Sequence, residues 1–360
     1  MLKPGSLDIT DVAVDKPLRN EVLVRTLGSG LCHSDLHVID GDYGAAGLDA
    51  PGGMLFGHEA SGVVEAVGED VTYVRAGDHV VTFPLQYCGH CEYCLRGMPT
   101  LCADSPGSRP ASAPPRLTRQ GRAVFQFNNL GGFAEQLLVH EHALVKVDPE
   151  YPMDRAAIIG CGVATGFGGV VNTAAVRAGS AVAVIGLGGV GLAAVQTASL
   201  VGARQIIAVD TEAAKLNLAL EFGASDCVDA SSVDPVDAVL ELSGGGVDYS
   251  FEAIGLKTTV EQALRMVRRA GIATVLGIAV GQHIELDGGL FVYERRLQGS
   301  LMGSCRPRID LPRIVELDLA GRLNLQGFID RRIALEEINN GYDAMRRRQI
   351  AGRRVITFSQ

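Results

Sequence analysis

Over the first 160 residues, short apolar runs rich in valine are separated by glycine and proline turns. Three of these runs predict β-strands, at residues 21–25, 62–67 and 79–83. Short strands between frequent turn residues are typical of a β-rich domain. A later stretch, residues 103–122, is rich in proline, serine and arginine, and it predicts a long surface loop.

From residue 161 to residue 302 the pattern changes, because short apolar runs alternate with helical stretches. Strands are predicted at 181–185, 206–210, 247–252 and 272–276, and helices after Gly191, at 212–222 and at 259–268. This alternation predicts a doubly wound parallel sheet, so the fold class is α/β. The final residues, 303–360, predict helices at 312–320 and 336–347 and a closing strand at 354–358.

Composition limits the classes of function. The 360 residues are 47% hydrophobic and carry a net charge of −9, which suits a two-domain enzyme and disfavours binding to nucleic-acid phosphates. Residues 178–203 carry no formal charge and are long enough to cross a bilayer, but glycines and polar residues interrupt them. The N-terminus lacks the apolar core of a signal peptide. We expect a cytoplasmic protein that binds neither nucleic acid nor membrane.

Four cysteines lie within fifteen residues, in a C-x2-C-x2-C-x7-C pattern. They are Cys88, Cys91, Cys94 and Cys102. Four thiolates this close in sequence form a tetrahedral sulfur site that suits zinc, and such sites are structural. The spacing therefore predicts a structural zinc lobe over residues 88–102.

Three further segments carry a cysteine or a histidine in a glycine-rich context, around Cys32, His58 and Cys161. Two cysteines and one histidine can bind a second zinc with three protein ligands and one open position, as catalytic sites do. Cys227 and Cys305 have no such neighbours, and we expect them to be ordinary buried thiols.

The run from residue 182 to 191 has the form strand, G-x-G-x-x-G, helix, and a second apolar run ends at Asp210. Glycines let the backbone approach a pyrophosphate, and the helix N-terminus contributes positive charge. Asp210 would accept hydrogen bonds from the ribose hydroxyls of NAD and would repel the additional phosphate of NADP. The pattern predicts a dinucleotide-binding domain.

Together these motifs resemble the zinc-dependent alcohol dehydrogenases of the medium-chain dehydrogenase/reductase superfamily. The resemblance rests on Cys32-His-Ser-Asp35, Gly57-His58-Glu59, the four-cysteine lobe, Gly160-Cys161-Gly162, the glycine-rich turn and the ending at 353–358, in this order over the whole chain. It implies a GroES-like catalytic domain at 1–160, an NAD-binding Rossmann domain at 161–302, and a return to the catalytic domain at 303–360.

The resemblance also implies roles for individual residues. Cys32, His58 and Cys161 would bind the catalytic zinc, with Glu59 beside it and Asp35 hydrogen-bonded to the zinc-bound imidazole. Ser34 and His37 would form the proton relay. Cofactor contacts would come from His33, Gly186, Gly188, Gly189, Val190, Gly191, Asp210, Lys215 and Arg353.

The function implied is an NAD-linked alcohol dehydrogenase with two zinc ions per chain. It would interconvert primary or simple secondary alcohols and their aldehydes or ketones by hydride transfer, because bound zinc lowers the pKa of an alcohol. The partners expected are a small-molecule alcohol or aldehyde and further copies of the chain, in a homodimer or homotetramer that pairs near residues 290–301.

Three alternatives remain. One is a dehydrogenase of the adduct between formaldehyde and a small thiol, in which Arg109 or Arg116 of the 103–128 loop would bind the adduct's carboxylate. Another is a polyol dehydrogenase, which Cys161 disfavours because that branch tends to have a carboxylate as third ligand. The third is a non-catalytic dinucleotide-binding protein.

Overall fold

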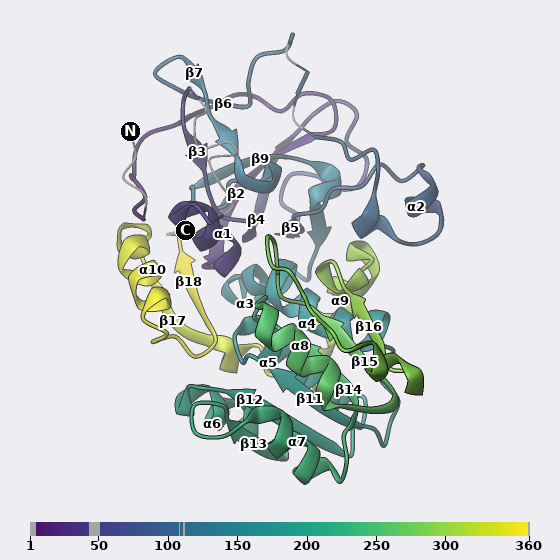
Figure 1. Ribbon diagram of the computed structural model, residues 1–360. Helices are drawn as coiled ribbons and strands as arrows, with labels where there is room; N and C mark the ends of the chain where they lie inside the picture. The colour runs from purple at the N-terminus through teal and green to yellow at the C-terminus, as the bar shows by residue number, and fades with distance from the viewer. Residues whose placement is uncertain (1–4, 43–50, 108, 111, 359–360) are drawn as a thin grey trace. The chain divides into compact units, whose positions relative to one another are not determined.

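The computed structural model describes residues 5–42, 51–107, 109–110 and 112–358. One of its sheets consists of parallel strands. Within these residues the sheet has six strands in the order β13-β12-β11-β14-β15-β16 (Figure 1). The strands are β11 (Ala181–Ile185), β12 (Gln205–Asp210), β13 (Asp226–Asp229), β14 (Val247–Glu252), β15 (Val267–Val275) and β16 (Arg296–Gly299). The main helices between them are α5 (Gly189–Leu200), α6 (Ala213–Glu221), α7 (Pro235–Ser243) and α8 (Lys257–Met266).

The apolar runs form strands here because both faces of the sheet are buried. All five residues of β11 are buried, and its side chains pack in one core with those of β12, β14 and α8. Strand β11 lies at the point where the strand order reverses, with β12 on one side and β14 on the other. The predicted doubly wound parallel sheet is therefore confirmed.

A second sheet, largely antiparallel, has seven strands among the described residues, in the order β10-β5-β4-β2-β18-β17 with β9 paired to β2. Its strands are β2 (Glu21–Gly30), β4 (Glu59–Val67), β5 (His79–Thr82), β9 (Gln136–His140), β10 (Leu144–Lys146), β17 (Ile329–Ile333) and β18 (Arg353–Thr357). Short strands β1 (Ala13–Val14), β6 (Leu117–Arg119) and β7 (Arg122–Ala123) pair with one another, as do β3 (Met54–Leu55) and β8 (Phe125–Gln126). The other helices are α1 (His33–Asp40), α2 (Glu92–Leu95), α3 (Met153–Ile158), α9 (Pro307–Leu319) and α10 (Ile338–Arg346), besides α4, which is described below.

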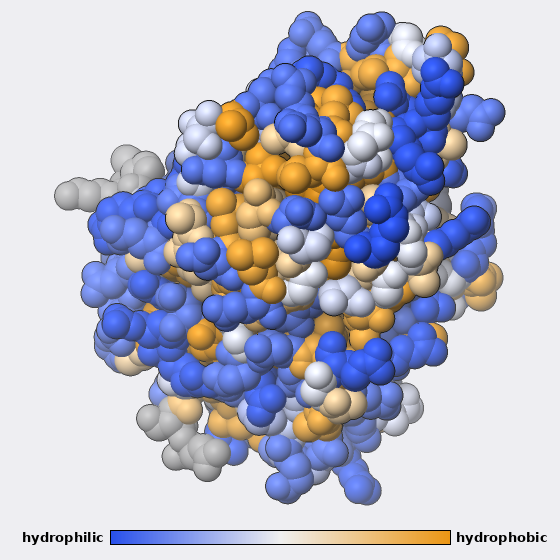
Figure 2. Space-filling view, turned by 90° about the horizontal axis from the view of Figure 1, so that it is seen from below, coloured by the Kyte–Doolittle hydropathy of each residue, from blue (hydrophilic) through white to orange (hydrophobic). Residues whose placement is uncertain are grey.

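The chain divides into two compact units. The first unit comprises Met1–Cys161, Arg306–Glu316 and Ile329–Gln360 and contains the antiparallel sheet. The second unit comprises Gly162–Cys305 and Leu317–Phe328 and contains the parallel sheet. Exposed apolar side chains of the second unit include Leu256, Val280 and Val292. Seen from below, the surface carries apolar side chains among hydrophilic ones (Figure 2).

One helical stretch among the described residues, Met153–Thr173, is long and apolar enough to cross a membrane. It comprises α3, a π-helical turn at Ile159–Val163, α4 (Ala164–Gly168) and a second π-helical turn at Gly169–Thr173. Of its most apolar window, 83% is buried inside the protein, which is typical of a core helix.

Two expected elements differ from the structure. Residues 290–293, expected to pair as a strand between copies, belong to a 3-10 helix, Gly288–Tyr293, which Asp287 caps by accepting a hydrogen bond from the Gly289 N–H. Within the expected region 290–301, the edge strand is β16. The helix expected at 259–268 ends at Met266, because Val267 adopts an extended conformation and begins β15.

The segment 103–122 is tied to the first unit more firmly than a surface loop would be. The Arg109 guanidinium donates to both carboxylate oxygens of Glu21, at 2.6–3.0 Å, and to Asp15. Nε of Arg116 donates to Glu21 Oε1 at 2.7 Å, and both arginine side chains are only 6% exposed. Burial tends to raise the pKa of Glu21, but these hydrogen bonds outweigh it and lower the pKa below its ordinary value. We call Glu21, Arg109 and Arg116 the loop clasp.

Replacing Arg109 by alanine should destabilise the protein by about 3 kcal/mol, because it leaves buried carboxylate charge incompletely paired. Chemical denaturation at pH 7 measures this loss. Arg75→Ala is the control, since Arg75 is 89% exposed and pairs with Asp78 at the surface, where such a pair contributes about 0.5 kcal/mol. The effect of Arg109→Ala should shrink as the pH falls through the lowered pKa of Glu21, because protonation then weakens the clasp in the wild type as well. Equal stability of the two variants would contradict a structural role for the clasp.

Candidate active site

Four buried side chains of the first unit converge at one point: Cys32, His58, Glu59 and Cys161. Each can offer one ligand atom, and these atoms lie within 4.8 Å of one another. The residues come from three distant segments, which the antiparallel sheet and the helix beginning at Met153 bring together. The three ligands predicted for the catalytic zinc are thus adjacent, with the predicted carboxylate beside them.

Local backbone geometry allows this convergence. Cys32 is the residue before α1, two positions after the end of β2. At Gly30, an added Cβ would lie 2.4 Å from Oε2 of Glu59, so glycine leaves room for the Glu59 carboxylate on the paired strand β4. Cys161 lies in the π-helical turn Ile159–Val163, and such turns occur often at functional sites because they redirect side chains.

The imidazole of His58 is oriented by Asp35. Nδ1 of His58 lies 3.0 Å from Asp35 Oδ2, and the other carboxylate oxygen accepts a hydrogen bond from the Gly57 N–H at 2.8 Å. Burial tends to lower the pKa of His58, but the negative charges of Asp35 and Cys32 outweigh this effect and raise it. With Nδ1 facing the Asp35 carboxylate, Nε2 is the atom left to bind a metal.

The pKa values of the two thiols, Cys32 and Cys161, are shifted in opposite directions. A hydrogen bond with Cys161, aided by the positive charge of Arg353, lowers the pKa of Cys32 well below its ordinary value. The same hydrogen bond and burial raise the pKa of Cys161. Arg353 is 4% exposed; its Nη2 lies 3.2 Å from Glu59 Oε1 and 3.8 Å from Cys32 Sγ. A lowered pKa favours the thiolate, which is the form that binds metal.

The donors at this point fit a zinc ion. Two thiols and an imidazole fixed by a carboxylate are a ligand set of catalytic zinc sites, and Glu59 is a further oxygen donor in reach. The charge of Arg353 offsets part of the buried negative charge. Zinc would therefore be bound by residues that the fold has already brought together.

The second sulfur cluster also has the dimensions of a zinc site. Cys88, Cys91, Cys94 and Cys102 have sulfur atoms within 4.8 Å of one another, and all eight cysteines are free thiols. Two sulfur–sulfur distances are 3.9 and 4.0 Å, close to the edge of about 3.8 Å of a tetrahedron with zinc–sulfur bonds of about 2.3 Å. Backbone N–H groups of residues 90 and 91 donate to Cys88 Sγ. Such bonds stabilise thiolates.

The glycine-rich turn lies in the second unit, between β11 and α5. At Gly191 an added Cβ would lie 1.8 Å from the carbonyl oxygen of Gly186, so the turn closes only with glycine there. Asp210 ends β12, and its Oδ2 accepts a hydrogen bond from the Leu187 N–H at 2.7 Å. Lys215 Nζ lies 3.8 Å from the same oxygen. The turn, the acid and the lysine predicted to contact the cofactor are thus neighbours.

The other predicted residues lie near the two sites or in their elements. Ser34 Oγ is 3.8 Å from Cys32 Sγ. His37 Nδ1 lies 2.7 Å from Asp42 Oδ2, and its ring is 6.5 Å from that of His33. Gly188 precedes α5, and Gly189 and Val190 form its first turn. The relay and cofactor roles of these residues stay predictions.

Two buried groups were missed from the sequence. Tyr342 of α10 is buried, and burial together with the charges of Asp35 and Cys32 raises the pKa of its phenol. Glu252 ends β14 as Asp210 ends β12, and it is fully buried. An acid at the end of an apolar run was the available signal for Glu252; the sequence around Tyr342 gives none.

Family models match most of both units. Residues 18–149 match the model described as alcohol dehydrogenase GroES-like domain, and residues 189–318 match the one described as zinc-binding dehydrogenase. Among curated relatives, S-(hydroxymethyl)glutathione dehydrogenase of Haemophilus influenzae is 37% identical over 94% of this chain and 91% of its own.

Solved structures agree with this. Benzyl alcohol dehydrogenase of Acinetobacter calcoaceticus has a TM-score of 0.89 and 30% identity, covering 97% of this chain and 94% of its own. An alcohol dehydrogenase of Thermus sp. ATN1 has a TM-score of 0.83 and 29% identity, covering 99% and 98%. The predicted family, the GroES-like and Rossmann fold and the zinc and nicotinamide dinucleotide cofactors are confirmed.

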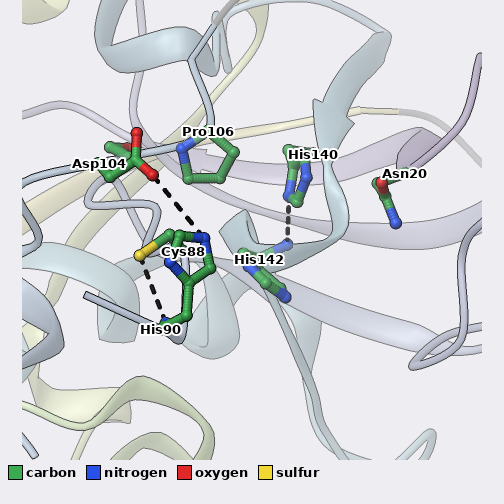
Figure 3. Close-up of a pocket in the computed structure, with 8 residues that line it drawn as sticks. Asn20, Cys88, His90, Asp104, Pro106, His140 and His142 are labelled. Atoms are coloured by element: carbon green, nitrogen blue, oxygen red, sulfur yellow. Dashed lines mark hydrogen bonds and ion pairs between the residues drawn. The ribbon is translucent and has the colours of Figure 1, made fainter. Parts of the chain in front are cut away.

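A polar pocket of about 320 Å³ lies next to the sulfur cluster (Figure 3). Its lining includes Asn20, Cys88, Asp104, His140 and His142. Nδ1 of His140 accepts a hydrogen bond from the His142 N–H, and this requires a deprotonated Nδ1. Burial, with the neighbouring His142, lowers the pKa of His140 to about 4.

This shift predicts that stability decreases as the pH falls from about 6.5, the pKa of an unfolded histidine, to about 4. The unfolded state takes up the proton first, and solvent screening of the partly exposed His140 ring makes its contribution smaller than the shift alone would give. His140→Asn keeps an acceptor for the His142 N–H but does not titrate, so its stability should fall less over this range. Urea denaturation at several pH values measures the difference. The exposed His283, replaced by asparagine, is the control; a pH dependence of His140→Asn equal to that of the wild type would contradict the assignment.

Proposed function

Because the chain belongs to the zinc-dependent alcohol dehydrogenases of the medium-chain dehydrogenase/reductase superfamily, we propose that it oxidises uncharged primary or simple secondary alcohols with NAD, and reduces the corresponding aldehydes and ketones. The observation that carries the proposal is the convergence of Cys32, His58 and Cys161 with the His58–Asp35 pair. A non-catalytic protein would have no need of this buried and charged group of side chains.

We assign the catalytic zinc to Cys32, His58 and Cys161, and the structural zinc to the four-cysteine lobe. When bound, the catalytic zinc supplies Lewis acidity that lowers the pKa of an alcohol hydroxyl. Asp35 keeps the imidazole in one tautomer and orientation, and Arg353 and Glu59 balance charge next to the ligands. Ser34, which lies near Cys32, would accept the hydroxyl proton while donating its own onward, and His37 would release a proton to water at the end of the relay.

Asp210 supports NAD as the preferred dinucleotide. Its carboxylate is 9% exposed and lies at the end of β12, where the doubly wound fold binds the adenosine ribose. The 2′-phosphate of NADP would be repelled by this negative charge. Lys215 is 3.8 Å away, and it would contact the same ribose.

A formaldehyde–thiol adduct is the second candidate substrate, because curated relatives 36–37% identical are named S-(hydroxymethyl)glutathione dehydrogenase. The loop clasp favours the uncharged alcohol. Arg109 and Arg116 were the candidates to bind the carboxylate of such an adduct, and both guanidinium groups are buried against Glu21. Binding a substrate carboxylate would require that these internal ion pairs break first.

We further propose that the protein works in the cytoplasm as a homodimer or homotetramer. Strand β16 is one of the two edge strands of the parallel sheet among the described residues, so its outer backbone groups are available for pairing with a second copy. This pairing would use Arg296–Gly299 rather than the 3-10 helix before it.

The proposed substrate class is tested by following NADH formation by the zinc-replete enzyme. The panel should contain ethanol, long-chain, benzylic and terpenoid alcohols, and formaldehyde with and without glutathione. We expect turnover of free alcohols and a higher kcat/KM for the best of them than for the adduct. Turnover of the adduct alone would overturn the proposed substrate but not the family.

The two cysteine clusters should differ in what their loss changes. Cys161→Ser should abolish turnover and remove one of two zinc ions while the melting temperature changes little. Cys94→Ser should remove the other zinc and lower the melting temperature, because structural zinc stabilises the fold directly. Zinc analysis, calorimetry and kinetics on both variants measure this. Equal loss of activity in both, with equal stability, would contradict the division into a catalytic and a structural site.

A further inference from the structure

Glu252 lies at the end of β14, at the switch point of the parallel sheet. Strand β14 is paired with β11, and Glu252 is in register with Ile185, the last residue before the glycine-rich turn. In doubly wound sheets, ligands bind outside the carboxyl ends of the strands at this point. The side chain of Glu252 is 0% exposed. A buried carboxylate at this position has to be compensated by hydrogen bonds.

One oxygen of the carboxylate provides this compensation. Oε1 accepts hydrogen bonds from the N–H groups of Ile254 and Gly255, at 2.8 and 2.7 Å, and from the Thr259 hydroxyl at 2.8 Å. Oε2 has no hydrogen-bond donor among the described residues. Glu252 therefore fixes the turn after β14 and the beginning of α8 through a single acceptor atom.

The same residue also contacts the segment after β15. Its carbonyl oxygen accepts hydrogen bonds from the N–H groups of Leu276 and Gly277, at 2.7 and 3.0 Å. At Gly277 an added Cβ would lie 2.7 Å from Glu252 Oε2 and 2.2 Å from the Gly255 nitrogen. The two segments that follow β14 and β15 are thus packed against one another around the carboxylate.

These two segments lie beside the dinucleotide site. Ile254 packs on the glycine-rich turn, since a Cβ added at Gly186 would lie 2.3 Å from its Cγ1. Asp210 and β12 lie on the adenosine side of β11, and β14 and β15 lie on the opposite side. A doubly wound sheet binds one mononucleotide half on each side of the switch point. The segments that Glu252 fixes therefore face the nicotinamide half.

We propose that Glu252 is a positioning residue for the dinucleotide: it fixes the backbone at residues 254–255 and 276–277 in the conformation that binds the cofactor. The proposal rests on the dinucleotide-binding function of this sheet edge. Glu252 acts through the backbone rather than by touching the reacting atoms. Its loss should weaken cofactor binding while leaving the alcohol's zinc site intact.

The test measures binding of NADH and NAD to the zinc-replete enzyme by calorimetry and by nucleotide fluorescence. Glu252→Ala should raise the Kd about tenfold, as expected for the loss of about one net hydrogen bond. KM for NAD should rise in parallel, whereas KM for the alcohol should stay constant. Glu252→Gln should recover most of the affinity, because all three donors bond to Oε1 and an amide oxygen can replace it.

A second variant covers the case in which Glu252→Ala does not fold. Thr259→Val removes one of the three donors and keeps the shape of the side chain, so it should raise the Kd about threefold. Asp248→Ala is the matched control: this carboxylate lies near the other end of β14 and accepts from the Ala181 N–H, so its loss affects stability without changing the Kd.

The outcomes separate the proposal from the function it rests on. Wild-type enzyme that binds no nicotinamide dinucleotide would refute the cofactor assignment itself. A wild-type Kd in folded Glu252→Ala would overturn the positioning role. If Glu252→Ala does not fold, a wild-type Kd in folded Thr259→Val would overturn it instead. A Kd of Glu252→Gln as high as that of Glu252→Ala would also overturn it. An equal loss of affinity in Asp248→Ala would reduce Glu252 to a general structural role and would also overturn the proposal.

Discussion

Compensation of buried charge is the constraint on which the first unit depends. Cys32, Asp35 and Glu59 lie within one small volume, and each is at most 5% exposed. Isolated anions of this kind would be very costly to bury. The fold places the imidazole of His58 against Asp35, and it places the guanidinium of Arg353 against Glu59 and Cys32. Zinc adds two positive charges at the point where the remaining negative charge is concentrated.

The charge balance explains why the active-site residues come from opposite ends of the chain. Arg353 begins β18, which pairs with the end of β2 next to Cys32. The C-terminal segment thus returns to the antiparallel sheet and brings its guanidinium to the cluster. Had the chain ended before β18, Glu59 and Cys32 would lack this cation. The split organisation of the first unit is therefore part of the site's electrostatics.

Carboxylates at strand ends play a repeated part in the second unit. Asp210 accepts from the Leu187 N–H, and Glu252 accepts from the N–H groups of Ile254 and Gly255. In both cases a loop at the carboxyl edge of the sheet leaves backbone donors without a helix or sheet partner, and a buried acid satisfies them. The loops remain fixed although little regular structure supports them.

Local patterns were sufficient to predict the parallel sheet and the four-cysteine cluster, whereas the ligand roles of Cys32, His58 and Cys161 came from the family resemblance. Strand β11 begins and ends where its apolar run does, because Ser180 and Gly186 bound the run. Contacts between distant residues could not be predicted in this way. Glu21 and Arg109 are 88 residues apart, and neither has a neighbour in sequence that indicates the other. The segment 103–122 therefore looked like a surface loop, although the side chains of Arg109 and Arg116 are buried.

The loop clasp shows why sequence similarity to named relatives does not by itself identify the substrate. The relatives named S-(hydroxymethyl)glutathione dehydrogenase are 36–37% identical, so most side chains around the substrate can differ. A site that recognises a carboxylate needs a cation with free donors. Here Arg109 uses its donors on Glu21, Asp15 and two backbone carbonyls. An arginine with its donors committed in this way stabilises the fold and contributes little to binding an anionic substrate, and this favours an uncharged alcohol.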